Sequence, residues 1–160
     1  MDAQPDPAAR KALAHDLARV IESRLLDPLD ILFGTGELLR KRVREETRAW
    51  AALVLGDDDK AAAYIAGRLI SALFPGDGPF DPPAEWWATP FGRAVALRVG
   101  HPTARAVPVS VAAAMLGITR QGVHDLLNRG KLTRHADGGV TVASIRARLA
   151  ARSAVNPSGR

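Results

Sequence analysis

The chain has 160 residues, is 47% hydrophobic and carries a formal net charge of +5, with a pI near 10.4. This composition supports a buried core, and a basic chain favours an acidic polymer as its partner. Cysteine is absent, which excludes disulfides and thiolate metal sites and leads us to expect a cytoplasmic, nucleoid-associated protein. No apolar run of transmembrane length and no secretory signal pattern occurs, so we expect no membrane partner.

Residues 1–99 predict a helical domain for dimerisation or for binding a protein partner. Asp6-Pro7 is typical of a helix start, and Asp27-Pro28 is expected to break that helix. Residues 28–33 are expected to form a short connection that covers the core. The apolar stripe of the helix consists of Leu13, Leu17, Val20, Ile21 and Leu25, and the connection carries Leu29, Ile31, Leu32 and Phe33.

A second helix is predicted from Glu37 to about Leu55, with Thr35 as its cap. Its charged outer face has two interpretations, a phosphate-contacting patch or a solvated face with Arg–Glu pairs. We favour the solvated face because acidic residues interrupt the basic ones. Leu39, Val43, Trp50 and Val54 are expected to face inward, and the outer face comprises Arg40, Lys41, Arg42, Arg44, Glu45, Glu46 and Arg48.

Residues 57–59, three aspartates, predict the start of a third helix that continues to about Phe74. Neighbouring positions at a helix start point in different directions, so we expect no metal there. Its inward positions are predicted to be Ala62, Ile65, Leu69 and Leu73.

Residues 75–83 are rich in proline and glycine and break the chain. Beyond them, Thr89-Pro90 predicts a helix to about Val99, preceded by a turn with two adjacent tryptophans. We expect one tryptophan in the core and the other free to reach a partner or the next domain. Residues 100–106 are predicted to be a linker, and the tryptophans are Trp86 and Trp87.

Residues 107–153 predict a second domain that begins with two short helices. Ser110 is the expected cap of the first helix, Gly117 suits its left-handed end, and Thr119 is the expected cap of the second. The second helix is predicted to bury Val123, Leu126 and Leu127 and to expose Arg120, Gln121, His124 and Asn128.

The Asp137-Gly138 pair between two β-type runs predicts a hairpin that carries Arg134 and His135. Ser144 is the expected cap of a last helix, and residues 154–160 are expected to be a frayed tail. In that helix, Ile145 and Leu149 are predicted to face inward, and Arg146, Arg148 and Arg152 outward.

This stretch resembles the winged helix-turn-helix of MerR-type regulators and phage excisionases. The matching segments are SVAAAMLGITRQGVHDLLNRGKL, GGVTV and SIRARL, within about 43 of 160 residues. It differs from MerR activators because no long coiled coil follows, and from excisionases because about 100 residues precede it. The resemblance implies base contacts from the second helix, through Thr119, Arg120, Gln121 and His124, and wing contacts from Arg134 and His135.

The residue chemistry agrees with DNA binding. Arginine pairs bidentately with guanine and glutamine with adenine, while Gly122 would allow close approach to DNA or to the first helix. Residues 101–160 carry nine basic and two acidic residues, a net charge of +7, against −2 for residues 1–100. The predicted DNA-binding residues are Ser110, Thr119, Arg120, Gln121, Gly122, His124, Arg129, Lys131, Arg134 and His135.

The fold class predicted is therefore mainly α, an N-terminal helical domain followed by a winged helix-turn-helix with a small β-hairpin wing. We expect a bacterial-type transcriptional regulator that binds double-stranded DNA as a homodimer, since one winged module contacts limited DNA surface. The alternatives are an architectural or recombination factor of excisionase type, and a protein-interaction adaptor that uses the helical domain.

Enzyme activity, metals and cofactors are not expected. The chain has no thiol nucleophile and no serine in a G-x-S-x-G turn. None of the four histidines has a neighbour at metal-ligand spacing; they are His15, His101, His124 and His135.

Overall fold

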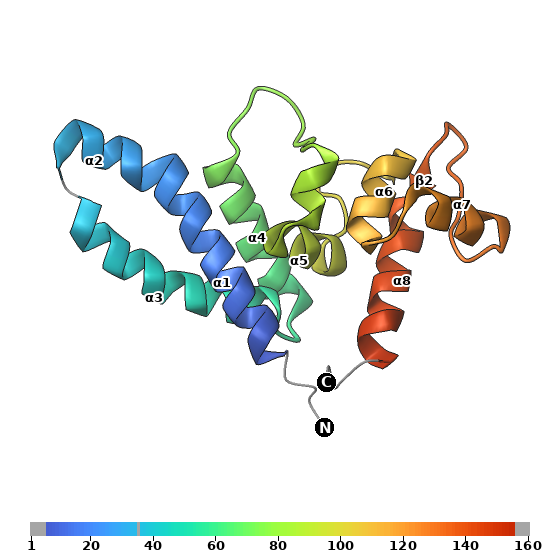
Figure 1. Cartoon of the computed structure of the whole chain (residues 1–160), viewed down its shortest axis with the longest axis horizontal. Helices are drawn as coiled ribbons and strands as arrows, with labels where there is room; N and C mark the ends of the chain where they lie inside the picture. The colour runs from blue at the N-terminus through green and yellow to red at the C-terminus, as the bar shows by residue number, and fades with distance from the viewer. Residues whose placement is uncertain (1–5, 35, 156–160) are drawn as a thin grey trace. The chain divides into compact units, whose positions relative to one another are not determined.

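The computed structural model describes residues 6–34 and 36–155, and it is mainly helical with a small antiparallel sheet (Figure 1). The chain forms two compact units, unit 1 up to Asp77 and unit 2 from Gly78. The cap expected at Thr35 and the end of the tail, 156–160, lie outside the described residues. Among the described helices, none combines the length and the apolar character that crossing a membrane requires.

Unit 1 is built from helices whose ends follow the predicted caps. The Asp6 side chain accepts a hydrogen bond from the Ala8 N–H, and Asp58 accepts from two N–H groups at the start of the last helix. The helix α1 lies along α3, and α4 packs on α3 (Figure 1). The elements are α1 (Pro7–Ile21), the π-helical turn η1 (Glu22–Leu26), α2 (Asp27–Phe33), α3 (Gly36–Val54) and α4 (Asp59–Leu73).

The predicted break at Asp27-Pro28 is wrong, because helical backbone continues through it. A proline inside an α-helix lacks the N–H and crowds the carbonyl four residues earlier. Here the wide turn of η1 precedes it, and the Asp27 N–H donates to the carbonyl of Glu22, five residues back. Pro28 then occupies the first turn of α2, where no N–H is needed.

The prediction that residues 28–33 cover the core is also wrong. Ile31, Leu32 and Phe33 are 85%, 71% and 70% exposed, and Leu38 on α3 is 86% exposed. Leu39, predicted inward, is also exposed, and α3 instead buries Thr47 and Ala51. The reason is the position of α4, which packs on α3 and not against α2, so no described helix of unit 1 covers this end (Figure 1). We call Leu29, Ile31, Leu32, Phe33 and Leu38 the apolar corner.

Unit 2 has short helices and a two-stranded sheet. Strand β1 pairs with β2, with Ala106 opposite Thr141 and Val107 opposite Val140. The segment around Arg134 forms an additional antiparallel bridge with Val140. The elements are the 3₁₀-helix η2 (Ala84–Ala88), α5 (Pro90–Arg98), β1 (Ala106–Val107), α6 (Val109–Leu116), α7 (Arg120–Asn128), β2 (Val140–Thr141) and α8 (Val142–Val155).

The predicted domain boundary at residue 99 lies too late in the chain. Trp87 is fully buried, and the half-buried Trp86 packs edge-on against Phe80 and Phe91. Trp87 also lies against the ring of His101; η2 packs on α5 and α6, and α5 packs on α6 and α8. The tryptophans therefore join residues 84–98 to unit 2, and the break at residues 75–83 contains the boundary. Residues 100–106 are likewise no free linker, because β1 begins within them.

Several capping predictions can be compared with the structure. Thr89 and Thr119 are caps as predicted, each accepting from the N–H three residues later. Ser110 is not a cap: α6 begins one residue earlier, after Pro108, whose fixed φ suits a helix entry. Ser144 is not a cap either, because Thr141 precedes α8 and its hydroxyl faces the Ser144 N–H at 3.4 Å. The helix α8 extends through Val155, beyond the predicted end at residue 153.

Candidate nucleic-acid interface

The corner between α6 and α7 is fixed by its backbone. Gly117 has φ = 65°, the left-handed conformation that ends α6, and the Ile118 N–H donates to the carbonyl of Ala113. Thr119 then starts α7, its hydroxyl accepting from the Gly122 N–H at 3.0 Å. Because both helix ends are satisfied locally, α7 leaves the corner in a defined direction.

The helix α7 is strongly two-sided. Val123 and Leu127 are buried against α6, and Leu126 is half-buried. Its other side exposes Arg120, Gln121, His124 and Asn128, as the sequence predicts. The Gln121 amide donates to the Asp125 carboxylate at 3.1 Å, an internal bond that a base contact by Gln121 would replace.

Gly122 is not required by packing within this corner. A Cβ atom placed there would lie 3.4 Å from Ile118 Cδ1 and from Thr119 Oγ1, and it meets no backbone of α6. Of the two roles predicted for this glycine, close approach to α6 therefore has no support.

The predicted hairpin follows α7. The His135 N–H donates to the Gly139 carbonyl, and Gly138 and Gly139 have φ of 97° and 79°. Arg134 is exposed on this hairpin. His135 is half-buried and its Nδ1 accepts from the Asp137 N–H, so part of its hydrogen-bonding capacity serves the turn itself.

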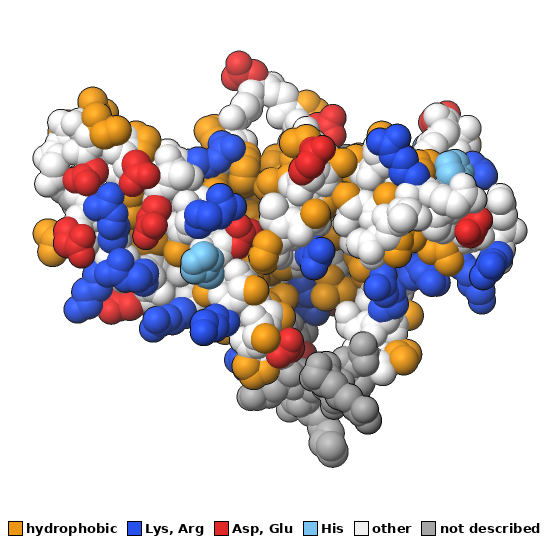
Figure 2. Space-filling model, viewed as in Figure 1, with side chains coloured by type: hydrophobic (Ala, Val, Ile, Leu, Met, Phe, Trp, Pro, Cys, Tyr) orange, Lys and Arg blue, Asp and Glu red, His pale blue; other side chains and the backbone are white. Residues whose placement is uncertain are grey.

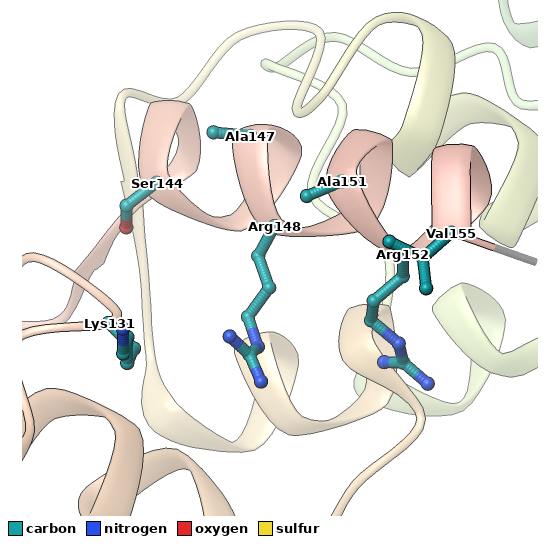
Figure 3. Close-up of a pocket in the computed structure, with 7 residues that line it drawn as sticks. All are labelled: Lys131, Ser144, Ala147, Arg148, Ala151, Arg152 and Val155. Carbon is teal, nitrogen blue, oxygen red and sulfur yellow. The ribbon is translucent and has the colours of Figure 1, made fainter.

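Beside the hairpin, α8 contributes cations that the sequence interpretation did not place in the site. A groove of about 570 Å³ is lined by Lys131 and by Ser144, Arg148 and Arg152 of α8. Figure 3 shows Arg148 and Arg152 extending from α8 toward the side on which Lys131 lies. The contribution of Arg148 to this groove can be recognised only from the tertiary structure, because Arg148 and Lys131 are distant in the sequence.

Arg146 and Arg152 are exposed, as predicted, and both also donate hydrogen bonds to backbone carbonyls. Arg146 donates to the carbonyl of Arg98 at 2.8 Å, at the end of α5. Arg152 donates to the carbonyl of Leu116 at 2.8 Å, at the end of α6. These guanidinium groups satisfy carbonyls that a helix end leaves free, and they hold α8 in place.

The predicted site residues thus fall into two groups. Gly122 and His135 are half-buried, and the exposed members are Thr119, Arg120, Gln121, His124, Arg129, Lys131 and Arg134. Ser110 lies half-buried in the first turn of α6. Cationic side chains gather over this end of unit 2 in the face drawn in Figure 2.

Within the part of the chain that the structure describes, no cluster of three histidine or acidic side chains could hold a metal ion. No known protein family, curated protein or solved structure matches this chain.

Proposed function

We propose that unit 2 is a winged helix-turn-helix module and that the chain is a DNA-binding transcriptional regulator. The observation that carries the proposal is the exposed polar face of α7, directed by the Gly117–Thr119 corner and flanked by the basic hairpin. In such modules the second helix lies in the major groove, and residues at its start contact base edges. Arg120 and Gln121 occupy those positions, and Arg134 would contact the backbone or minor groove.

The charge distribution supports the proposal. Unit 2 contains eleven basic and four acidic residues, a net charge of +7, whereas unit 1 has a net charge of −2. A basic module attracts the phosphate backbone regardless of base sequence. Lys131 and Arg148, at the groove beside α8, add to the cations that a backbone close to the hairpin would meet.

Selection of binding sites from random duplexes tests this function. A regulator is expected to enrich one sequence, and its affinity for that sequence should fall steeply with salt as counterions are released. Enrichment of no sequence, with tight salt-dependent binding, would favour an architectural or recombination factor. An absence of duplex binding at low ionic strength would overturn the DNA proposal and favour a protein-interaction adaptor.

The regulator would act as a homodimer, and we assign the apolar corner of unit 1 to a second copy of the chain. Its four most exposed side chains, Ile31, Leu32, Phe33 and Leu38, are 70–86% exposed, and large exposed apolar side chains gathered at one place mark protein–protein contact sites. Residues 25–41 carry three acidic and two basic residues. This near balance lets two copies meet without strong repulsion and offers no attraction for DNA or for an anionic membrane.

Sedimentation of Ile31→Ser/Phe33→Ser tests the dimer. We expect the wild-type protein at twice its 17.0-kDa chain mass and the variant at the chain mass. Leu53→Ser/Tyr64→Ser is the matched control, because both residues are exposed on unit 1 outside the corner. A monomeric wild-type protein, or equal dissociation of the control, would contradict the assignment.

A further inference from the structure

A second cationic surface lies in unit 1, between α1 and α3. The two helices border an open groove of about 680 Å³. Basic side chains reach it from both sides, and Thr47, Ala14 and Ala18 lie between them. We call it the cationic groove; its basic lining consists of Arg10, Lys11, His15 and Arg19 from α1 and Arg44 and Arg48 from α3. Figure 2 shows basic side chains gathered over α1 and α3 in this view.

Except for Arg19, the cations of the groove form no ion pair with the described acidic residues of unit 1. Asp16 is buried and pairs with Arg19 at 2.8 Å, Glu46 pairs with Arg42 at 3.6 Å, and Glu22 alone contributes a carboxylate to the lining. Among the described residues, no carboxylate forms an ion pair with Arg10, Lys11, Arg44 or Arg48. Unit 1 is acidic as a whole, so these positive charges are concentrated on one face.

Helical geometry explains why the acidic residues of α3 do not line this groove. Residues four apart lie on the same side of a helix, so Arg44 shares one side with Arg48, and Arg42 shares another with Glu46. Glu45 and Glu46 do not line the groove. The charged side chains of α3 therefore have two kinds of surroundings. The Arg42–Glu46 pair is a solvated ion pair, and Arg44 with Arg48 lines the groove.

The lining also indicates the class of ligand. It contains no Phe, Tyr or Trp side chain, and His15 is its one aromatic ring, so the lining is dominated by groups that suit phosphates rather than bases. The α1 side, from Arg10 to Arg19, extends about 14 Å along the helix. That length corresponds to roughly four base-pair steps along the axis of a DNA duplex.

We propose that the cationic groove contacts the phosphodiester backbone of duplex DNA, as a second contact surface in addition to unit 2. Long, exposed arginine side chains suit phosphate contacts, and such contacts position a protein on DNA without reading its sequence. The inference rests on the proposed DNA-binding function. Under this inference, unit 1 contributes to the affinity for DNA but not to the preference for one base sequence over another.

The salt dependence of DNA binding by the full chain tests the groove. For Arg44→Gln/Arg48→Gln we expect the slope of log K against log salt to become shallower by about two, since each lost phosphate contact removes about 0.9. The affinity ratio between the selected duplex and a scrambled one should stay unchanged. Lys60→Gln/Arg68→Gln removes the same charge from exposed positions of α4 and should keep the wild-type slope.

Each outcome decides between the alternatives. Equal slopes for the groove variant and its control, with wild-type binding intact, overturn the groove while leaving the function of unit 2 in place. A wild-type protein that binds no duplex overturns both. An unchanged slope together with loss of pyrophosphate binding, measured by calorimetry, overturns the DNA contact and assigns the groove to a small phosphorylated ligand. Circular dichroism melting of each variant confirms that unit 1 remains folded.

Discussion

Two helix–helix corners in this molecule both turn at a left-handed glycine, but they expose different kinds of side chain. Gly34 ends α2 and Gly117 ends α6, both with φ = 65°. A side chain closes each corner: Asp30 accepts from the Gly36 N–H at 2.8 Å, and Thr119 accepts from the Gly122 N–H at 3.0 Å. The first corner then presents leucine, isoleucine and phenylalanine to solvent, and the second presents arginine and glutamine.

The comparison separates what builds a corner from what the corner does. Glycine and a local acceptor fix the direction of the outgoing helix and say nothing about its partner. The partner is decided by the exposed side chains on either side of the turn, an apolar set suited to another protein surface and a polar set suited to base edges. Substitutions of the exposed side chains should therefore change binding, while substitutions of the turn residues should change stability.

The largest effect is expected from Arg120→Ala/Gln121→Ala. Each side chain removed should cost about 1–3 kcal/mol of discrimination between the selected duplex and a scrambled one. Competition gel shifts measure the loss, and thermal melting should stay near the wild-type value because both residues are exposed. Ile31→Ser/Phe33→Ser, at the other corner, should leave the discrimination per bound subunit intact. Wild-type discrimination by the α7 variant would refute the assignment of α7.

A smaller and equal effect is expected when either glycine becomes alanine. A left-handed conformation costs an L-residue about 1–2 kcal/mol, and a new Cβ at Gly34 or Gly117 meets no atom within 4 Å. Both variants should therefore lose that amount in the free energy of unfolding, measured by denaturant titration. Gly67→Ala is the matched control: it lies inside α4 with equally open space, so it should stabilise by about 0.5–1 kcal/mol. Clearly unequal losses at the two corners would break the comparison.

The smallest effect concerns the acceptor of the first corner. The Gly36 N–H, with Arg40 beside it, lowers the pKa of Asp30 below its ordinary 3.8. A lowered folded pKa means that the carboxylate stabilises the corner above the ordinary value and that this contribution is lost as the pH falls through the folded value. Asp30→Asn should thus be less stable than wild type at neutral pH, and this deficit should be smaller at a pH well below the ordinary 3.8. Denaturant titrations at both pH values measure the difference, and a constant deficit would contradict this role.

Local signals allowed much of the fold to be predicted. The caps at Asp6, Asp58, Thr89 and Thr119 depend on hydrogen bonds to nearby residues, so the sequence contains both partners. The glycine end of α6 and the hairpin after α7 are equally local. The exposed side of α7 followed from its apolar periodicity alone.

The sequence did not predict the features that depend on contacts between residues far apart in the chain. Residues 28–33 look like core because they are apolar, yet burial depends on whether α4 reaches them. The boundary at residue 99 ignored that Trp87 packs toward later helices. The exposure of Arg146 and Arg152 was predicted correctly, but their carbonyl partners lie 48 and 36 residues away, and periodicity does not indicate such partners. For the same reason Arg148 and the cationic groove could be recognised only once helices from different parts of the chain lay side by side.

The attachment of Trp87 to unit 2 has a practical consequence for dissecting the chain. A truncation that starts at residue 100 would strip η2 and α5 from the flanks of α6 and α8, and the newly bared apolar surfaces would favour aggregation. A truncation that starts at Gly78 retains those aromatic anchors. Fragments made to test the proposed DNA recognition should therefore start at Gly78, in the proline-rich stretch, and not at residue 100 or later.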